Sequence, residues 1–162
     1  MNLQTGKVVL EKTKDLTPHP KNPNQHSDGQ VERLALLIKE HGWRVPIIVS
    51  NRSGHIVSGH GRLLAAKKNG WEQVPVVRQD FDSEESEYAF LVSDNAIASW
   101  AELDLSSINM SIAELGPDFD LDHLGIKNFK LDPSELAIDI KEPGLGAEPP
   151  TNQCPNCGHI LK

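Results

Sequence analysis

The stretch IVSGHGRLLAAKKNGWEQVPVV, Ile56–Val77, decides the fold of this chain. It reads as a strand, a turn with two glycines, an amphipathic helix closed by Asn69-Gly70, and a second strand at Val74–Val77. The first N–H groups of a helix have no partner within the helix, and its dipole favours negative charge there. The turn therefore predicts a corner that binds phosphate or carboxylate.

The residues of the turn, Gly59-His60-Gly61-Arg62, suit this chemistry. The glycines allow positive φ and a close approach of the backbone to a ligand. Arg62 supplies a forked donor for phosphate, and His60 can donate to an anion or act as an acid or base near neutral pH. Spacing alone leaves an alternative open, in which a tight turn needs its glycines and Arg62 is simply solvated.

The flanking sequence predicts an α+β domain with most strands in its first half. A loop rich in proline and asparagine precedes a helix capped by Ser27 or Asp28 and ended by Gly42. Asp82-Ser83-Glu84-Glu85 starts a later helix. The other expected elements are strands at Lys7–Glu11, Pro46–Ser50 and His55–Ser58 and helical pieces at Ser106–Leu115 and Leu121–Leu124.

Apolar periodicity defines the expected core. Pro75 within the strand Val74–Val77 indicates an edge position or a strand start. We expect the tryptophans to pack in the core or at its rim. The predicted core residues are Leu34, Ile38, Ile47, Val49, Ile56, Leu63, Ala66, Val74, Val76, Leu91 and Val92.

The charge is distributed unevenly along the 162 residues, whose net charge is −7. Residues 31–80 carry eight Lys or Arg against four acids, whereas residues 81–162 carry four against sixteen. The basic middle can face a phosphate-bearing ligand, although a merely solvated surface explains it equally well. We divide the chain into a domain at 1–100, an acidic helical extension at 101–140, and a flexible linker and tail at 141–162.

Three motifs in order, between about Leu16 and Ser99, resemble the ParB/sulfiredoxin superfamily. They are HPKNPNQHS (19–27), GHGRLLAA (59–66) and VSDNAIA (92–98). Within the superfamily, the chain is most similar to the ParB-like N-terminal domain, also called the ParB-like nuclease domain, of phage DNA-modification methylases and partition proteins. This resemblance implies a small ParB/sulfiredoxin-like fold with a short mixed sheet and flanking helices.

The resemblance also implies a nucleoside triphosphate, CTP or ATP, held with Mg²⁺. The third motif would hold the metal through Asp94 and Asn95. The nucleotide and its phosphates would be bound by Asn22, Asn24, His26, Ser58, Gly59, His60, Gly61 and Arg62.

The resemblance leaves three functions open. The first is an accessory or regulatory module in phage or prophage DNA modification or DNA handling. The second is a metal-dependent nuclease, nucleotide hydrolase or phosphoryl-transfer enzyme with His60 as the catalytic candidate. The third is an adaptor that binds a methyltransferase or another phage protein. A homodimer is also implied by analogy.

Two activities of related proteins fit the sequence poorly. Leu103–Asp139 is acidic and has no basic recognition helix, so any DNA contact is not expected to use a helix-turn-helix. Sulfiredoxins use a cysteine nucleophile in the second motif, whereas this chain has His60 there and no cysteine before Cys154.

The tail carries CPNCGH, in which Cys154, Cys157 and His159 are candidate Zn²⁺ ligands. Such a site would need completion by His123 or by a second chain, and a tail with two free thiols is the alternative.

The remaining candidate residues suggest no further site. His19 has no nameable partner and is expected at the surface or in a cap, and Glu84, Glu85 and Glu87 are expected on a solvated helix face. No apolar stretch approaches the roughly 20 residues of a membrane span, and the N-terminus lacks a signal-peptide pattern, so we expect a cytoplasmic protein.

Overall fold

A computed structural model describes residues 6–115, 118–126 and 130. Within these residues a five-stranded sheet is accompanied by α-helices and two short 3-10 helices. The strands are β1 (Val8–Lys12), β2 (Thr17–Pro18), β3 (Ile47–Ser50), β4 (His55–Ser58) and β5 (Gln73–Gln79). The helices are η1 (Thr13–Asp15), α1 (Asp28–His41), α2 (His60–Lys68), α3 (Glu84–Ala98), α4 (Leu105–Leu115) and η2 (Leu121–Leu124).

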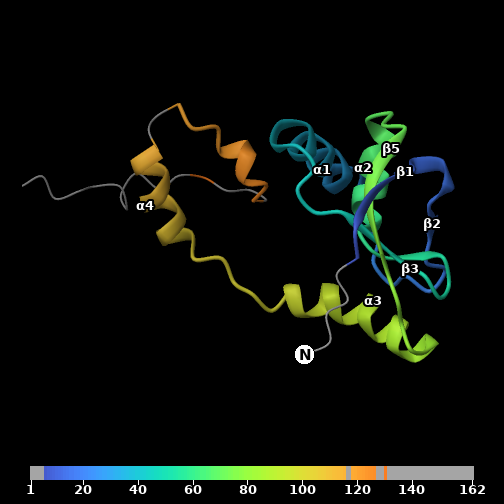
Figure 1. Ribbon diagram of the computed structural model, residues 1–162. Helices are drawn as coiled ribbons and strands as arrows, with labels where there is room; N and C mark the ends of the chain where they lie inside the picture. The colour runs from blue at the N-terminus through green and yellow to red at the C-terminus, as the bar shows by residue number, and fades with distance from the viewer. Residues whose placement is uncertain (1–5, 116–117, 127–129, 131–162) are drawn as a thin grey trace, which may run out of the picture. The chain divides into compact units, whose positions relative to one another are not determined.

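The sheet is mixed, with the strand order β1-β5-β3-β4-β2. β5 pairs antiparallel with β1 and parallel with β3, whereas β3 and β4 form an antiparallel hairpin. The two-residue β2 runs parallel to β4 at the far edge. β1 and β5 lie side by side in Figure 1. This topology confirms the predicted α+β class with a short mixed sheet.

The prediction that Pro75 marks an edge strand or a strand start is wrong. β5 lies between β1 and β3, and Pro75 is the third residue of the strand, opposite Leu10. The pairing with β3 starts only at Val76. A proline, which has no N–H to donate, can therefore be accommodated inside this interior strand.

Side-chain caps fix where α1 and α3 begin. Ser27 accepts a hydrogen bond from the backbone N–H of Gln30 at 3.3 Å, and Ser83 accepts one from Ser86 at 3.1 Å. Three acids in the first turn of α3 complement its dipole. Gly42, with φ of 74°, ends α1. The caps agree with the positions predicted from the sequence.

The core forms where α2 packs on the sheet. Leu63 and Ala66 of α2 contact a cluster of buried strand residues, and Trp43 and Trp71 pack against its rim. Eight of the predicted core residues are buried: Ile47, Val49, Ile56, Leu63, Ala66, Val74, Val76 and Leu91. The other three, Leu34, Ile38 and Val92, are only partly buried.

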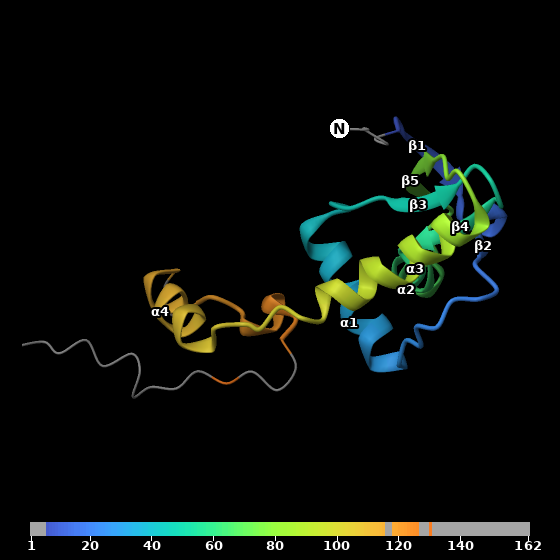
Figure 2. The same ribbon diagram turned by 90° about the horizontal axis from the view of Figure 1, so that it is seen from below.

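Two further helices complete this body. α1 packs beside α2, as Figures 1 and 2 show, and the Asn69 side chain donates to the carbonyl of Ala35 at 3.0 Å. α3 contacts β4. The C-terminal end of β4 is thereby placed between the start of α2 and the side of α3.

The chain divides into two compact units. The described part of the first comprises residues 6–103 and 120–126; the second includes α4. The helical pieces predicted at Ser106–Leu115 and Leu121–Leu124 correspond to α4 and η2. No helix in the described ranges is long and apolar enough to cross a membrane.

Candidate functional site

The corner between β4 and α2 has the geometry of an anion site. Gly59 caps α2 with φ of 101°, and the helix begins at the next residue, His60. The N–H of Leu63 donates to the carbonyl of Gly59 at 3.0 Å. The amides of His60, Gly61 and Arg62 have no acceptor among the described residues. Three backbone donors are therefore free at the positive end of a helix dipole.

A hollow of about 460 Å³ lies in front of this corner. One part of its wall is polar and comes from the helix start, the first-motif loop and α3. Another part is apolar and includes Leu34, Val45, Ile48 and Ala98. Sequence patterns do not reveal this apolar part, because its residues come from four separate segments. Such a division suits a ligand with an anionic end and a less polar ring.

Arg62 lies over the backbone of Gly59. A Cβ atom added at Gly59 would stand 3.0 Å from Nε of Arg62, so only glycine leaves room for the guanidinium. This Nε is enclosed and has no hydrogen-bond partner among the described residues. Burial lowers the pKa of Arg62, and the nearby charge of Asp94 opposes that shift. An enclosed donor without an acceptor is unusual in a folded protein.

The third motif reaches the same hollow from α3. Ser58 donates to Oδ2 of Asp94 at 2.9 Å, and Nη2 of Arg62 approaches the Ser58 hydroxyl at 3.5 Å. The amide nitrogen of Asn95 donates to the carbonyl of Leu91 at 3.1 Å. One oxygen each of Asp94 and Asn95 thus has no hydrogen-bond partner in the described part of the chain, and these oxygens are the available metal ligands.

His60 lies almost fully inside the protein, with 8% of its surface exposed. Its Nε2 accepts a hydrogen bond from the backbone N–H of His19 at 3.1 Å. Burial, with smaller contributions from the charges of His26 and His19, lowers the pKa of His60 to about 4. The imidazole is therefore neutral at pH 7, and it lines the hollow as an uncharged group.

The first-motif loop contributes two of its three expected residues directly. Asn24 and His26 line the hollow, and the ring of His26 lies against Gly61. Asn22 instead organises the loop, since its side-chain oxygen accepts the backbone N–H of Asn24 at 3.2 Å. All other nucleotide and Mg²⁺ candidates, from Ser58 to Arg62 and at Asp94 and Asn95, meet at this one hollow.

Two expectations about isolated polar residues are wrong. His19 is buried rather than at the surface, and Glu87 is 2% exposed rather than on a solvated helix face. The two side chains approach each other, with 3.5 Å between Nε2 of His19 and Oε1 of Glu87. No local pattern reveals this burial, because Glu87 follows two exposed acids in the first turn of α3.

Other parts of the described surface lack these features. Hollows of about 580 and 720 Å³ lie near the end of α2 and beside α1. The hollow beside α1 reaches the start of that helix, where Ser27 accepts from the N–H of Gln30. Although larger, neither hollow is lined by an enclosed side-chain donor that lacks a partner among the described residues. In the described ranges, no group of three or more His, Cys, Asp or Glu is placed to hold a metal ion. The candidate zinc ligands Cys154, Cys157 and His159 lie outside the described residues.

Comparisons with known proteins identify the domain. The model of the ParB N-terminal domain matches residues 1–96. A relative from Escherichia coli K12, the ParB-like nuclease domain-containing protein YnaK, is 37% identical over 71 residues, which are 44% of this chain and 80% of YnaK. The nucleoid occlusion protein of Bacillus cereus AH187 is 32% identical over 84 residues, which are 49% of this chain and 29% of that protein.

A solved structure has the same fold. It is the C-terminally truncated chromosome-partitioning protein ParB of Caulobacter crescentus in complex with CTP-γ-S, with a TM-score of 0.57 and 24% sequence identity. The match covers 68% of this chain and 63% of that one. The present chain thus spans less than a third of the nucleoid occlusion protein and under two thirds of the Caulobacter chain.

Proposed function

We propose, because this chain belongs to the ParB N-terminal domain family, that it binds a nucleoside triphosphate at the start of α2. The family relates it to chromosome-partitioning and nucleoid occlusion proteins. In the proposed complex, phosphate oxygens accept from the free amides of His60, Gly61 and Arg62.

The observation that carries the proposal is the enclosed Nε of Arg62. A folded protein rarely leaves such a donor without an acceptor, because desolvating it costs about 1–3 kcal/mol. A phosphate oxygen in the hollow would supply that acceptor. The alternative reading of the turn, with Arg62 simply solvated, does not account for an enclosed nitrogen.

The oxygen atoms of the third motif also suit a divalent cation that is shared with the ligand. Asp94 and Asn95 offer one carboxylate and one amide oxygen, and Mg²⁺ typically takes one or two protein ligands and completes its shell with phosphates and water. When bound, the ion would neutralise phosphate charge beside Asp94. The chain's own contribution is to hold that carboxylate against the corner through Ser58.

CTP is the first ligand to test, because the Caulobacter ParB of the same fold was solved with CTP-γ-S. We further propose that nucleotide binding serves a regulatory or accessory role in DNA handling, such as DNA modification or partition. The partner in that role would be DNA, or a second protein that acts on DNA.

A nuclease function is the second candidate, because the Escherichia coli relative YnaK is named a ParB-like nuclease domain-containing protein. His60 fits the role of general acid or base poorly. Its Nε2 already accepts a hydrogen bond, and its pKa of about 4 is far from neutral pH. We therefore place nucleotide binding first.

Calorimetric titration tests the proposal. CTP, ATP and their diphosphates are titrated with and without Mg²⁺ into wild-type protein, Arg62→Ala and Asp94→Ala. We expect saturable binding of one triphosphate to wild type, loss of binding in Arg62→Ala, and loss of the Mg²⁺ effect in Asp94→Ala. Absence of binding by wild type to every nucleotide would refute the proposal. Incubation of the same proteins with plasmid DNA and Mg²⁺ tests the nuclease candidate.

A further inference from the structure

A buried carboxylate outside the corner gathers three polar partners. The Ser50 hydroxyl donates to Oε2 of Glu87 at 2.8 Å, and the Ser53 hydroxyl donates to Oε1. Nε2 of His19 lies 3.5 Å from the same Oε1. Glu87 thereby ties α3 both to the β3–β4 hairpin and to the loop that carries the first motif. A buried polar network with satisfied members of this kind fixes one arrangement of the segments it joins.

The surroundings of His19 assign the position of its proton. The backbone N–H of Lys21 donates to Nδ1 of His19 at 3.1 Å, so Nδ1 must be unprotonated. Burial lowers the pKa of His19, and Glu87 opposes that shift. The proton of the neutral ring is consequently on Nε2, which faces the Glu87 carboxylate. The ring edge also contacts His55, with 5.5 Å between the centroids.

His19 reaches the ligand corner through its backbone. Its N–H donates to Nε2 of His60 at 3.1 Å, in a buried contact. A neutral imidazole that accepts at Nε2 carries its proton on Nδ1. Nδ1 of His60 has no partner among the described residues, so its N–H is available to a ligand oxygen. The two histidines should therefore have opposite tautomers.

We propose that Glu87 is a positioning residue for the ligand corner. It acts through His19 to hold His60 as a neutral donor with its proton on Nδ1. This inference deepens the proposed nucleotide function and rests on it for the ligand. Without the Glu87 carboxylate, the His19 ring loses its acceptor, and the segment that presents the His19 N–H is less firmly held. His60 can then exchange between its two tautomers, and the tautomer with Nε2 protonated cannot accept from His19.

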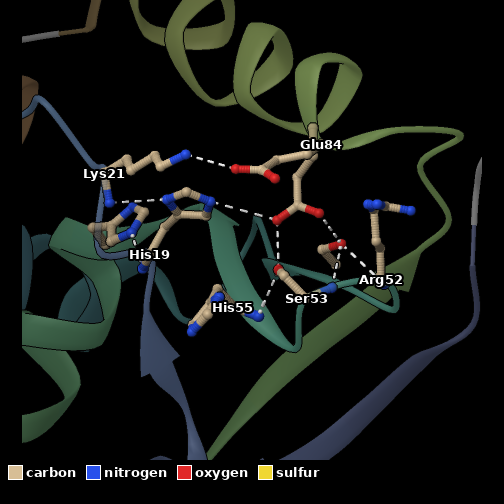
Figure 3. A network of polar contacts seen from close by, with 9 residues as sticks. His19, Lys21, Arg52, Ser53, His55 and Glu84 are labelled. Carbon is tan, nitrogen blue, oxygen red and sulfur yellow. Dashed lines mark hydrogen bonds and ion pairs between the residues drawn. The ribbon is translucent and has the colours of Figure 1, made fainter.

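Glu84, on the same helix, provides a matched comparison for Glu87. Figure 3 shows Lys21 facing Glu84, which lies one helical turn before Glu87 on α3. This pair is 2.6 Å apart, but its side chains are 60% and 65% exposed. Exposed ion pairs contribute little to structure. Glu84 thus has the charge, the residue type and the helix of Glu87 without its burial, and it serves as the control.

The first experiment needs no variant. Wild-type protein with ¹⁵N-labelled histidine is examined by NMR spectra that report the protonation of each ring nitrogen between pH 5.5 and 7.5. We expect His60 to stay neutral with the proton on Nδ1, and His19 to stay neutral with the proton on Nε2. A His60 ring with its proton on Nε2, or one that titrates near pH 6.5, would overturn the inference.

The second experiment compares Glu87→Gln with Glu84→Gln. The glutamine amide keeps one acceptor oxygen but has an NH2 group in place of the other and carries no charge, so the partners that meet at Glu87 can no longer all be satisfied. We expect mixed tautomers at His60 in Glu87→Gln and a loss of about five- to tenfold in affinity for CTP with Mg²⁺, the size of one hydrogen bond. Glu84→Gln should match wild type in both measurements.

The outcomes separate the two proposals. Unchanged tautomers and affinity in Glu87→Gln would refute the role of Glu87. A wild-type protein that binds no nucleotide would refute the proposed function, whereas the His60 tautomer would still decide the positioning role. Urea unfolding of each variant separates lost stability from lost affinity. Should Glu87→Gln fail to fold, Ser53→Ala replaces it, and the same shift in tautomer and affinity is required.

Discussion

Replacing Gly59 by alanine should damage the ligand corner in a way that can be separated from stability. Gly59 has φ of 101°, a conformation that side-chain-bearing residues rarely adopt. The added Cβ would lie 3.0 Å from Nε and 3.1 Å from Nη2 of Arg62, and 3.2 Å from Cγ1 of Ile47. Because Ile47 is buried in the core, the guanidinium is the group that must move.

This geometry predicts two separate losses for Gly59→Ala, one in the free energy of unfolding and one in nucleotide affinity. The left-handed backbone costs an alanine about 1–2 kcal/mol of the free energy of unfolding. Displacing Arg62 removes a charge-assisted hydrogen bond to phosphate, which contributes about 1.5–3 kcal/mol. That energy corresponds to a loss of about 10- to 150-fold in nucleotide affinity.

Gly70→Ala is the matched control. Gly70 has φ of 68°, but nothing lies within 4 Å of its added Cβ. Both variants should lose similar stability in urea unfolding, whereas calorimetry should detect weaker binding of CTP with Mg²⁺ only in Gly59→Ala. Equal affinities for the two variants would refute the assignment of Arg62 to the phosphate.

Three further predictions concern the same corner. Arg62→Lys, which keeps the charge but loses the forked donor and Nε, should lower CTP affinity about tenfold in the same calorimetric assay with little change in stability. Gly61→Ala should change stability by less than about 1 kcal/mol, because the better helix propensity of alanine is offset by the close contacts of its Cβ with His26 and Leu34. Its Cβ would stand 3.1 Å from Cε1 of His26, so a slower nucleotide association rate is expected, measured by stopped flow, if the loop has to move aside. Unfolding free energy should fall as the pH drops from about 6.5 to about 4, because the unfolded chain protonates His60 at its ordinary pKa of 6.5 whereas the folded chain resists until about 4. Urea titrations of wild type and His60→Gln across this range measure the fall in unfolding free energy. An equal pH dependence in both proteins would contradict the prediction.

Local sequence signals were sufficient for most of the fold. Ser27 and Ser83 mark helix starts through contacts with residues three positions away, and Gly42 marks a helix end through its positive φ. The short apolar runs of β3 and β4 are recognisable as strands from their own residues. The corner was predictable for the same reason, because residues 58–62 are consecutive. Pro75 shows where local rules fail, since the position of β5 in the sheet depends on strands far away in the sequence.

The buried polar network could not be inferred from local patterns. Glu87 follows two exposed acids in the first turn of α3, and its composition alone indicates a solvated face. Its partners His19, Ser50 and Ser53 come from a loop and a hairpin that are 68, 37 and 34 residues away. Only the packing of α3 on the sheet decides that this acid, rather than Glu84 or Glu85, is enclosed.

The free amides at the start of α2 have a consequence for how such a domain diversifies. Main-chain donors survive nearly every amino-acid exchange, so the proposed contacts between these amides and phosphate would persist while the apolar side chains around the hollow change. Preference for one base over another can then change at Val45, Ile48 or Ala98, which lie on separate segments of the wall. Such a domain could therefore acquire a new nucleotide preference through a single substitution in the wall, while the amides at the start of α2 stay unchanged.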